Sequence, residues 1–275
     1  MRPAQIEHLS RRLSRHGSHK VPEVTLLFWA IKLLSTAMGE STSDYLVFHI
    51  DPYVAVVAGS LGLLVALALQ LRARRYVAWV YWLAVVMVAV FGTMAADVLH
   101  VVLHVPYLAS SIGFASALAL VFALWYRVEG TLSIHSIVTL RREFFYWAAV
   151  MATFALGTAL GDLTAATLGW GYLASALVFA VLFVLPAAGY RWFGWGAIAA
   201  FWSSYVVTRP LGASVADWLA KPILGGLGIG DGPVAIGLTV AIVALVGYLT
   251  LTRIDVPTDE PGSFVPDLTQ SRSCA

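Results

Sequence analysis

The sequence predicts an all-α membrane protein with eight transmembrane helices, built from four tandem two-helix repeats. Two observations predict this class. Hydrophobic residues make up 60% of the 275 positions and charged residues only 12%, whereas about a quarter of the residues in a soluble domain are charged. The second observation is an internal repeat, in which an aromatic-Trp pair is followed by Gly ten residues after the Trp and by Asp five residues later.

The repeat occurs four times, always inside an apolar stretch. The positions are Trp29-Gly39-Asp44, Trp82-Gly92-Asp97, Trp147-Gly157-Asp162 and Trp202-Gly212-Asp217. At the Gly and Asp frequencies of this chain, a given Trp would meet both conditions by chance only roughly three times in a thousand, so four occurrences indicate duplication. The duplication predicts four carboxylates at equivalent depths in a membrane.

Each unit has room for two spanning helices of about 20 apolar residues. The expected helices are residues 24–47, 52–71, 77–100, 107–126, 144–166, 170–189, 194–218 and 233–252. They group into repeats of about 21–74, 75–130, 141–190 and 191–254, inside one membrane domain of residues 21–254. The Trp-Gly-Asp pattern lies on the first helix of each repeat. The second helices are rich in Ala, Gly and Ser, which suits close packing in lipid.

Basic residues give the orientation. They gather at alternate connections: Arg2, Arg11, Arg12, Arg15, Lys20, Arg72, Arg74, Arg75, Arg127, Arg141, Arg142, Arg191 and Arg253. Lys221 is the only Lys or Arg in the opposite connections. Because Lys and Arg accumulate on the cytoplasmic side, we expect both termini in the cytoplasm, the repeat Trp toward the cytoplasmic interface and the repeat Asp in the outer half.

Because each unit has two spans, the four first helices are expected to run the same way, as a pseudo-fourfold array about the membrane normal. Three segments would lie outside the membrane on the cytoplasmic side. They are a basic N-terminal segment, 1–20, a linker at about 127–142, and a polar tail, 255–275, which its composition predicts to be disordered.

The repeat residues differ in what they predict. The repeat Gly indicates close helix packing or a local break, and the repeat Trp an interfacial anchor, with a substrate contact as the alternative. The repeat Asp indicates a site, since an Asp at the centre of a spanning helix costs roughly 2.5 to 3.5 kcal/mol. The alternative is an Asp in water at a helix end, but an Asp there opposes the helix dipole.

The first helices of repeats one and four contain further polar residues. Lys32, Thr36, Glu40 and Asp44 follow one another at steps of four along one helix face. Repeat four contributes Arg209, next to Pro210, which is expected to kink its helix. Glu40 is expected to pair with Arg209 or Lys32, because repeats one and four would be neighbours in a closed ring. A salt bridge that only fixes helix packing is the alternative.

A metal site is a second possibility in repeat two. Asp97, His100 and His104 share a helical face, and carboxylate and imidazole groups are ligands for Mn, Fe, Co or Zn ions. The alternative for the histidines is simple solvation at the interface.

The carboxylates outnumber the buried cations, so the cluster must bind protons or capture a cation. We therefore expect a secondary transporter or exporter of a small cation, with a divalent metal exchanged for protons as the favoured cargo. Asp44, Asp97, Asp162 and Asp217 would bind the ion, with Thr36 and His100 as auxiliary ligands. Glu40 would relay protons, and Lys32 and Arg209 would set the local charge.

Other classes have less support. The alternative is a non-transporting membrane sensor or assembly module in which Trp and Asp serve packing. A further option is a protein that binds a small molecule between the four Trp, including a chromophore on Lys32. No catalytic motif is present, so no enzyme and no resident cofactor are expected. The net charge of +2 is spread over membrane edges, which disfavours nucleic acid, and the single Cys274 excludes disulfides within the chain.

Several local motifs resemble a known family. They are Lys20-Val21-Pro22-Glu23-Val24-Thr25, Gly39-Glu40-Ser41-Thr42-Ser43-Asp44, His135-Ser136-Ile137, Arg141-Arg142-Glu143 and Phe154-Ala155-Leu156-Gly157-Thr158. The chain is similar over residues 20–255 to bacterial membrane-anchored proteins catalogued as domain of unknown function 347. The resemblance implies four tandem two-span repeats, each with a Trp, in a bacterial inner membrane, and no substrate. Repeats two to four lack the Lys32 and Glu40 equivalents, so the copies differ in function.

Overall fold

A computed structural model describes residues 19–256, which form eight α-helices and contain no strand. The α-helices are α2 (Leu26–His49), α3 (Pro52–Arg72), α4 (Ala78–Asp97), α5 (Tyr107–Glu129), α6 (Leu140–Asp162), α7 (Gly171–Trp192), α8 (Ala197–Ala220) and α9 (Asp231–Thr252). Two π-helical turns, η1 (Val98–Val102) and η3 (Leu163–Thr167), continue α4 and α6, and a 3-10 turn, η2 (Ile134–Ser136), lies in the linker before α6. The predicted helices agree with these bounds to within a few residues.

Local sequence explains several helix ends. The side chain of Thr25 accepts a hydrogen bond from the Phe28 amide at the start of α2. Asp51 caps α3 in the same way, and Pro52 occupies its first turn, where a missing amide proton costs nothing. At the end of α5 the chain turns through Gly130 at φ +70°, a left-handed conformation that glycine adopts without strain.

Six of the described helical segments are long and apolar enough to cross a membrane. They are Pro52–Arg72, Ala78–His100, Tyr107–Glu129, Leu140–Thr167, Gly171–Trp192 and Asp231–Thr252. This set indicates a multi-pass membrane protein. Helices α2 and α8 are equally long but are more polar, since they carry most of the buried charged residues.

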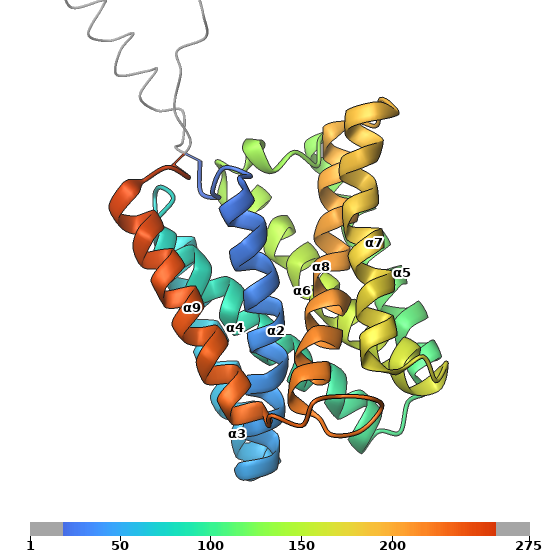
Figure 1. The fold of residues 1–275 in the computed structure, drawn as a ribbon. Coiled ribbons are helices and arrows are strands. Elements are labelled where there is room, and N and C mark those ends of the chain that lie inside the picture. Colours follow the sequence, from blue (N-terminus) through green and yellow to red (C-terminus); the bar gives the residue numbers. More distant parts are fainter. Residues whose placement is uncertain (1–18, 257–275) are drawn as a thin grey trace, which may run out of the picture.

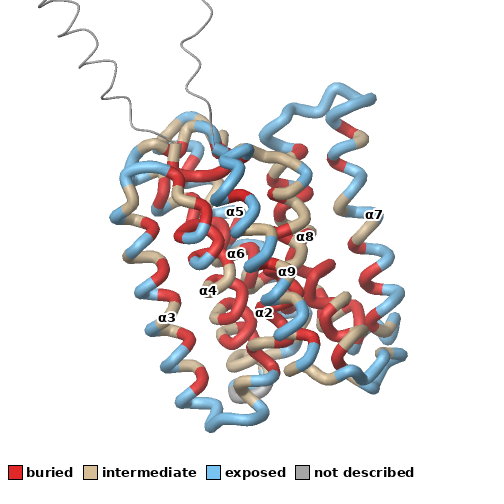
Figure 2. Tube along the Cα trace, turned by 60° about the vertical axis from the view of Figure 1, so that its left-hand side comes forward, coloured by how far each residue is buried: buried red, intermediate tan, exposed pale blue. Residues whose placement is uncertain are grey.

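The helices form an inner ring and an outer layer. Helices α2, α4, α6 and α8 contact one another in that order, and α8 contacts α2 again, which closes the ring. The outer helices α3, α5, α7 and α9 pack mainly against the inner helix of the following repeat, so that α9 returns to α2 (Figure 1). Figure 2 shows the buried segments concentrated on the inner helices, whereas α3 and α7 are largely exposed.

An aromatic layer crosses the ring at the beginning of the inner helices. In each repeat, the aromatic residue before the Trp packs against the Trp of the next repeat. The ring centroids are 5.7 Å apart for Phe28–Trp82, 5.8 Å for Tyr81–Trp147, 6.2 Å for Tyr146–Trp202 and 5.6 Å for Phe201–Trp29. Trp82, Trp147 and Trp202 are at most 5% exposed. The prediction of interfacial anchors is therefore wrong for these three residues, because their neighbours in the ring cover them.

A glycine layer follows further along the helices. A Cβ atom added to Gly39 would lie 2.4 Å from the Ala89 Cβ, and one added to Gly92 would lie 2.9 Å from the Phe154 Cβ. The same construction at Gly157 meets the Arg209 Cγ at 2.3 Å, and at Gly212 it meets the Thr36 Oγ1 at 2.0 Å. Each neighbour lies three residues before the repeat Gly of the next inner helix. The predicted role of the Gly in close packing is confirmed.

These two layers also fix the direction of the inner helices. Aromatic residues meet aromatic residues, and glycines meet the turn before the next glycine, in the same order on every inner helix. The four helices therefore run parallel. We call the end that carries the aromatic layer the aromatic end, and the opposite end, which carries the repeat Asp, the aspartate end.

Connecting segments converge at the aromatic end. Buried Lys20 places its Nζ 2.6 Å from Glu143 Oε2, and Gln70 Nε2 donates to Glu143 Oε1 at 3.0 Å. Tyr76 donates to Asp255 Oδ2, and burial, together with this carboxylate, raises the pKa of Tyr76, so the phenol keeps its proton.

Both ends of the described chain lie at the aromatic end (Figure 1). Asp255 is only 1% exposed, so the predicted disordered tail begins too early. The rest of that tail, residues 257–275, and the N-terminal residues 1–18 lie outside the described part of the chain.

Candidate functional site

Arg209 occupies the centre of the ring, just beyond the glycine layer. Its Nη2 donates to Glu40 Oε2 at 2.5 Å and to Thr158 Oγ1 at 2.7 Å, and it also contacts Thr93 Oγ1. These three acceptors follow the repeat Gly directly in repeats one, two and three. Arg209 is completely buried, and the expected Glu40–Arg209 pair is present. The arrangement brings four repeats to one charged group.

Lys32, the alternative partner of Glu40, lies closer to the aromatic layer. Its Nζ is 4.0 Å from the ring centroid of Phe154 and 4.3 Å from that of Tyr205, and it has no hydrogen-bond partner among residues 19–256. The Lys32 nitrogen therefore lies against the faces of two aromatic rings. The hydroxyl of Thr36 contacts backbone carbonyls, at 2.7 Å from Leu33 O and 3.1 Å from Thr208 O. Thr36 thus links α2 to α8 beside Gly212.

One carboxylate cluster lies between repeats one and four. Ligand oxygens of Glu40, Asp44 and Asp217 lie within 4.8 Å of one another, and all three side chains are buried. Lys221, directly after α8, places its Nζ 2.8 Å from Asp44 Oδ2 and 2.8 Å from Asp217 Oδ1. We call these three acidic residues the oxygen cluster. Its repeat Asp residues already have a cationic partner.

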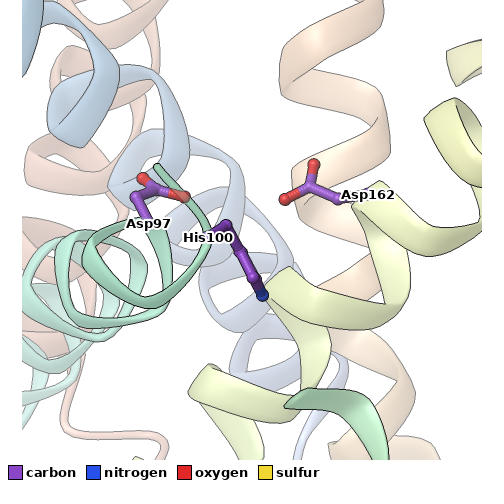
Figure 3. Close-up of side chains that lie close together, drawn as sticks. All are labelled: Asp97, His100 and Asp162. Carbon is purple, nitrogen blue, oxygen red and sulfur yellow. The ribbon is translucent and has the colours of Figure 1, made fainter. Parts of the chain in front are cut away.

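A second cluster lies between repeats two and three. Ligand atoms of Asp97, His100 and Asp162 lie within 4.8 Å of one another, and the three residues are partly exposed. Figure 3 shows the two carboxyl groups turned toward one another across the space between α4 and α6, with the imidazole beside them. The His100 Nε2 lies 2.7 Å from the Ser110 Oγ of α5. We call this group the mixed cluster.

Both aspartates of the mixed cluster end an α-helix. Asp97 precedes the π-helical turn η1, and Asp162 precedes η3, whereas α2 and α8 remain α-helical past their repeat Asp. A π-turn changes the direction of the side chains that follow it and is frequent at functional sites. A π-turn directly after the repeat Asp is therefore a feature of repeats two and three, which contribute the mixed cluster, and of neither other repeat.

The predicted metal set changes in one member. His104 was expected to share a helical face with Asp97 and His100, but α4 ends at Asp97, and His104 lies beyond the π-turn at φ +53°. The helical periodicity on which the expectation depended does not extend that far. Asp162, from the next repeat, joins Asp97 and His100 instead.

Two carboxylates and one imidazole suit a first-row divalent ion such as Mn, Fe, Co or Zn. Three protein ligands would leave coordination positions for water or for a moving ion. The contact between His100 Nε2 and Ser110 is the kind of outer contact that orients a ligating imidazole, and it leaves Nδ1 for a metal. The oxygen cluster contains only hard ligands, which suit Mg, Ca or Mn.

Sequence reasoning missed the partners of these residues. Lys221 follows Asp217 by four residues, which is the spacing of a helical ion pair, so the sequence contained a signal for this partner. Thr93 and Thr158 could have been found from the repeat register, because they occupy the Glu40 position of their repeats. We find no residue pattern that signals the two π-turns or the contact of Ser110 with His100.

Comparison with known proteins identifies a repeat family. A family model described as "Repeat of Unknown Function" (DUF347) matches residues 27–76, 80–131, 145–194 and 200–255. Each match covers one inner helix and the following outer helix, apart from a few residues. No curated protein and no solved structure matches the chain. Since the four matches cover most of the sequence, the chain belongs to the DUF347 repeat family.

Proposed function

We propose that this protein is a secondary transporter that exchanges a divalent metal ion for protons across a bacterial inner membrane. The observation that supports this most is the convergence of the repeat carboxylates on the inside of the ring, with the atoms of the mixed cluster within 4.8 Å of one another. Carboxylates inside a membrane are costly and usually mark an ion or proton pathway.

The charge balance supports a cation site at the mixed cluster. Arg209 is engaged with Glu40, and Lys221 with Asp44 and Asp217, while Lys32 lies over aromatic rings. The remaining repeat carboxylates must be neutralised by protons or by a bound cation. Competition between protons and a metal ion for the same two carboxylates is the physical basis of exchange.

The repeat residues then have separate roles. Asp97, Asp162 and His100 bind the metal ion, and Asp44 and Asp217 form the opposite part of the same ring. Glu40 relays protons, and the positive charge of Arg209 favours the ionised form of the Glu40 carboxyl group. The aromatic layer closes the ring on one side, so the ion enters this conformation from the aspartate end.

All eight helices span the membrane in this proposal. Helices α2 and α8 are parallel to α4 and α6 in the ring, and their charged residues Lys32, Glu40, Arg209 and Asp217 are buried within the protein. Lipid therefore does not meet these charges. The basic residues at the aromatic end support a cytoplasmic location of that end and of both termini.

The proposal is tested by ion flux in liposomes. We expect Mn²⁺ entry to drive proton exit, and we expect Asp97→Asn or Asp162→Asn to lower the flux roughly 10- to 100-fold, because each removes a ligand charge from the site. Glu23→Gln is the matched control, since it removes one carboxylate charge at the aromatic end. Wild-type flux in both aspartate variants would contradict the proposal.

A membrane sensor is the second candidate. The observation that favours it is the closed packing of aromatic residues and Arg209 across the ring. Metal binding by the purified protein, lost in Asp97→Asn, together with no flux in liposomes, would select the sensor.

A further inference from the structure

The two clusters of the ring differ in what they contain. Each holds two repeat aspartates and one further acidic or imidazole ligand, and in each the ligand atoms lie within 4.8 Å. The oxygen cluster already contains a positive charge, because the Lys221 ammonium lies 2.8 Å from an oxygen of each of its aspartates.

Lys221 lies where its ammonium group can block the access of ions to the oxygen cluster. It follows the last residue of α8, and its side chain is 24% exposed, while those of Asp44 and Asp217 are 11% and 5% exposed. The ammonium therefore lies between the carboxylates and the solvent at the aspartate end. The segment behind it is fixed to α8, with Leu227 N donating to Trp218 O at 2.7 Å and Gly230 N to Ala220 O at 3.0 Å.

We propose that Lys221 is a tethered cation that fills the oxygen cluster and limits the ring to one free divalent-ion site. This inference rests on the proposed function of the ring as a cation pathway. Lys221 is then the residue that determines stoichiometry: the mixed cluster takes the ion, and the oxygen cluster is kept for an ammonium group.

Removing the lysine should create a site of predictable chemistry. Glu40, Asp44 and Asp217 carry three negative charges, and Arg209 compensates one of them at Glu40 Oε2. The two remaining charges match a divalent ion, and an all-carboxylate set favours Mn²⁺, Mg²⁺ or Ca²⁺. The mixed cluster also accepts Mn²⁺, so this ion reports on both clusters.

The experiment counts bound Mn²⁺ per full-length chain in detergent, from the loss of the free-ion signal in electron paramagnetic resonance. We expect one ion in the wild type and two in Lys221→Gln. Lys221→Arg, which keeps a cation at this position, should bind one. Adding Asp217→Asn to Lys221→Gln should return the count to one.

A chemical rescue keeps the test independent of one variant. Lys221→Cys in a Cys274→Ser background should bind two ions, and modification with aminoethyl methanethiosulfonate, which restores an ammonium group, should return the count to one. Modification with methyl methanethiosulfonate, which adds no charge, should leave the count of bound Mn²⁺ at two. A count of one for both Lys221→Gln and unmodified Lys221→Cys would overturn the inference and leave the proposed function standing.

The remaining outcomes separate the two proposals. If the wild type binds no ion but Lys221→Gln binds one that Asp217→Asn removes, Lys221 fills the oxygen cluster as inferred, but the metal site at the mixed cluster, and with it the one free site of the ring, is wrong. If neither the wild type nor Lys221→Gln binds Mn²⁺, both are wrong.

Discussion

At the scale of single residues, the core of this protein is defined by charges that the fold has to compensate. Arg209 and Lys32 are fully buried, and Glu40 is 3% exposed. Arg209 is compensated by a carboxylate and two hydroxyl groups, whereas Lys32 relies on two aromatic faces. A buried charge without a partner is far more costly than a neutral residue of the same size, so removing one member of the pair should cost more than removing both.

We therefore expect Arg209→Met to destabilise the protein by roughly 3–5 kcal/mol, because it leaves the Glu40 carboxylate buried and unpaired. The double variant Glu40→Gln/Arg209→Met should recover much of this loss. Thermal unfolding in detergent measures both. Arg141→Met is the control, since its side chain is 67% exposed in a pair with Glu129 and should cost at most about 1 kcal/mol. A double variant as unstable as the single one would show that the charge imbalance is not the cause.

At the scale of elements, the packing of the inner helices depends on how closely a neighbouring helix can approach each of them. Each repeat Gly accepts the next inner helix at a distance that leaves no room for a Cβ atom. The outer helices carry glycines that have no such contact, for example Gly237 in α9, where an added Cβ atom would meet nothing within 4 Å. The same residue type therefore lies in a close helix contact at Gly39 and in open space at Gly237.

Substitution of Gly39 and of Gly237 by Ala tests this difference directly. Gly39→Ala should lower the unfolding temperature, because its Cβ atom would lie 2.8 Å from the backbone carbon of Ala89 and α2 would have to move away from α4. Gly237→Ala should be neutral or should raise stability by up to about 1 kcal/mol, because alanine favours the helix. Circular dichroism during heating compares the two. Equal effects would indicate that Gly39 has no special packing role.

At the scale of the whole molecule, the protein is a ring that closes on itself. The main contacts between repeats have the same polarity, from one repeat to the next, and the last repeat returns to the first through α8 and α9. Such a head-to-tail contact forms a closed ring only when the rotation per unit matches the number of units. The closure brings Asp44 to Asp217 and Glu40 to Arg209, although these residues belong to opposite ends of the sequence.

The proposed membrane orientation is a property of the whole ring, and the single native cysteine can test it. Cys274 follows Asp255, which lies at the aromatic end, so we expect an impermeant maleimide to label it in inverted vesicles but not in intact cells. Phe48→Cys in a Cys274→Ser background should show the reverse, because Phe48 is 77% exposed near the aspartate end. Labelling of Cys274 in intact cells would contradict a cytoplasmic aromatic end.

The repeat, the helices and the apolar class can be read from the amino-acid sequence alone. These features depend on local composition and spacing, which the chain carries in every repeat: the interval from Trp29 to Gly39 and Asp44 recurs three more times. The sequence also indicated a buried pair of Glu40 with Arg209 or Lys32, and the structure selects Arg209.

Which carboxylates share a cluster depends on how the helices pack, and no sequence pattern indicates it. The division of the four aspartates into two pairs depends on Lys221, which follows α8 and pairs with Asp44 and Asp217, and on the neighbouring position of α4 and α6, which brings Asp162 to Asp97 and His100. The π-turn after Asp97 holds His100 and ends before His104. The tertiary structure also decided that Trp82, Trp147 and Trp202 are core residues. Exposure and partners depend on the neighbouring helix, and a periodic pattern within one helix carries no information about the helix that packs against it.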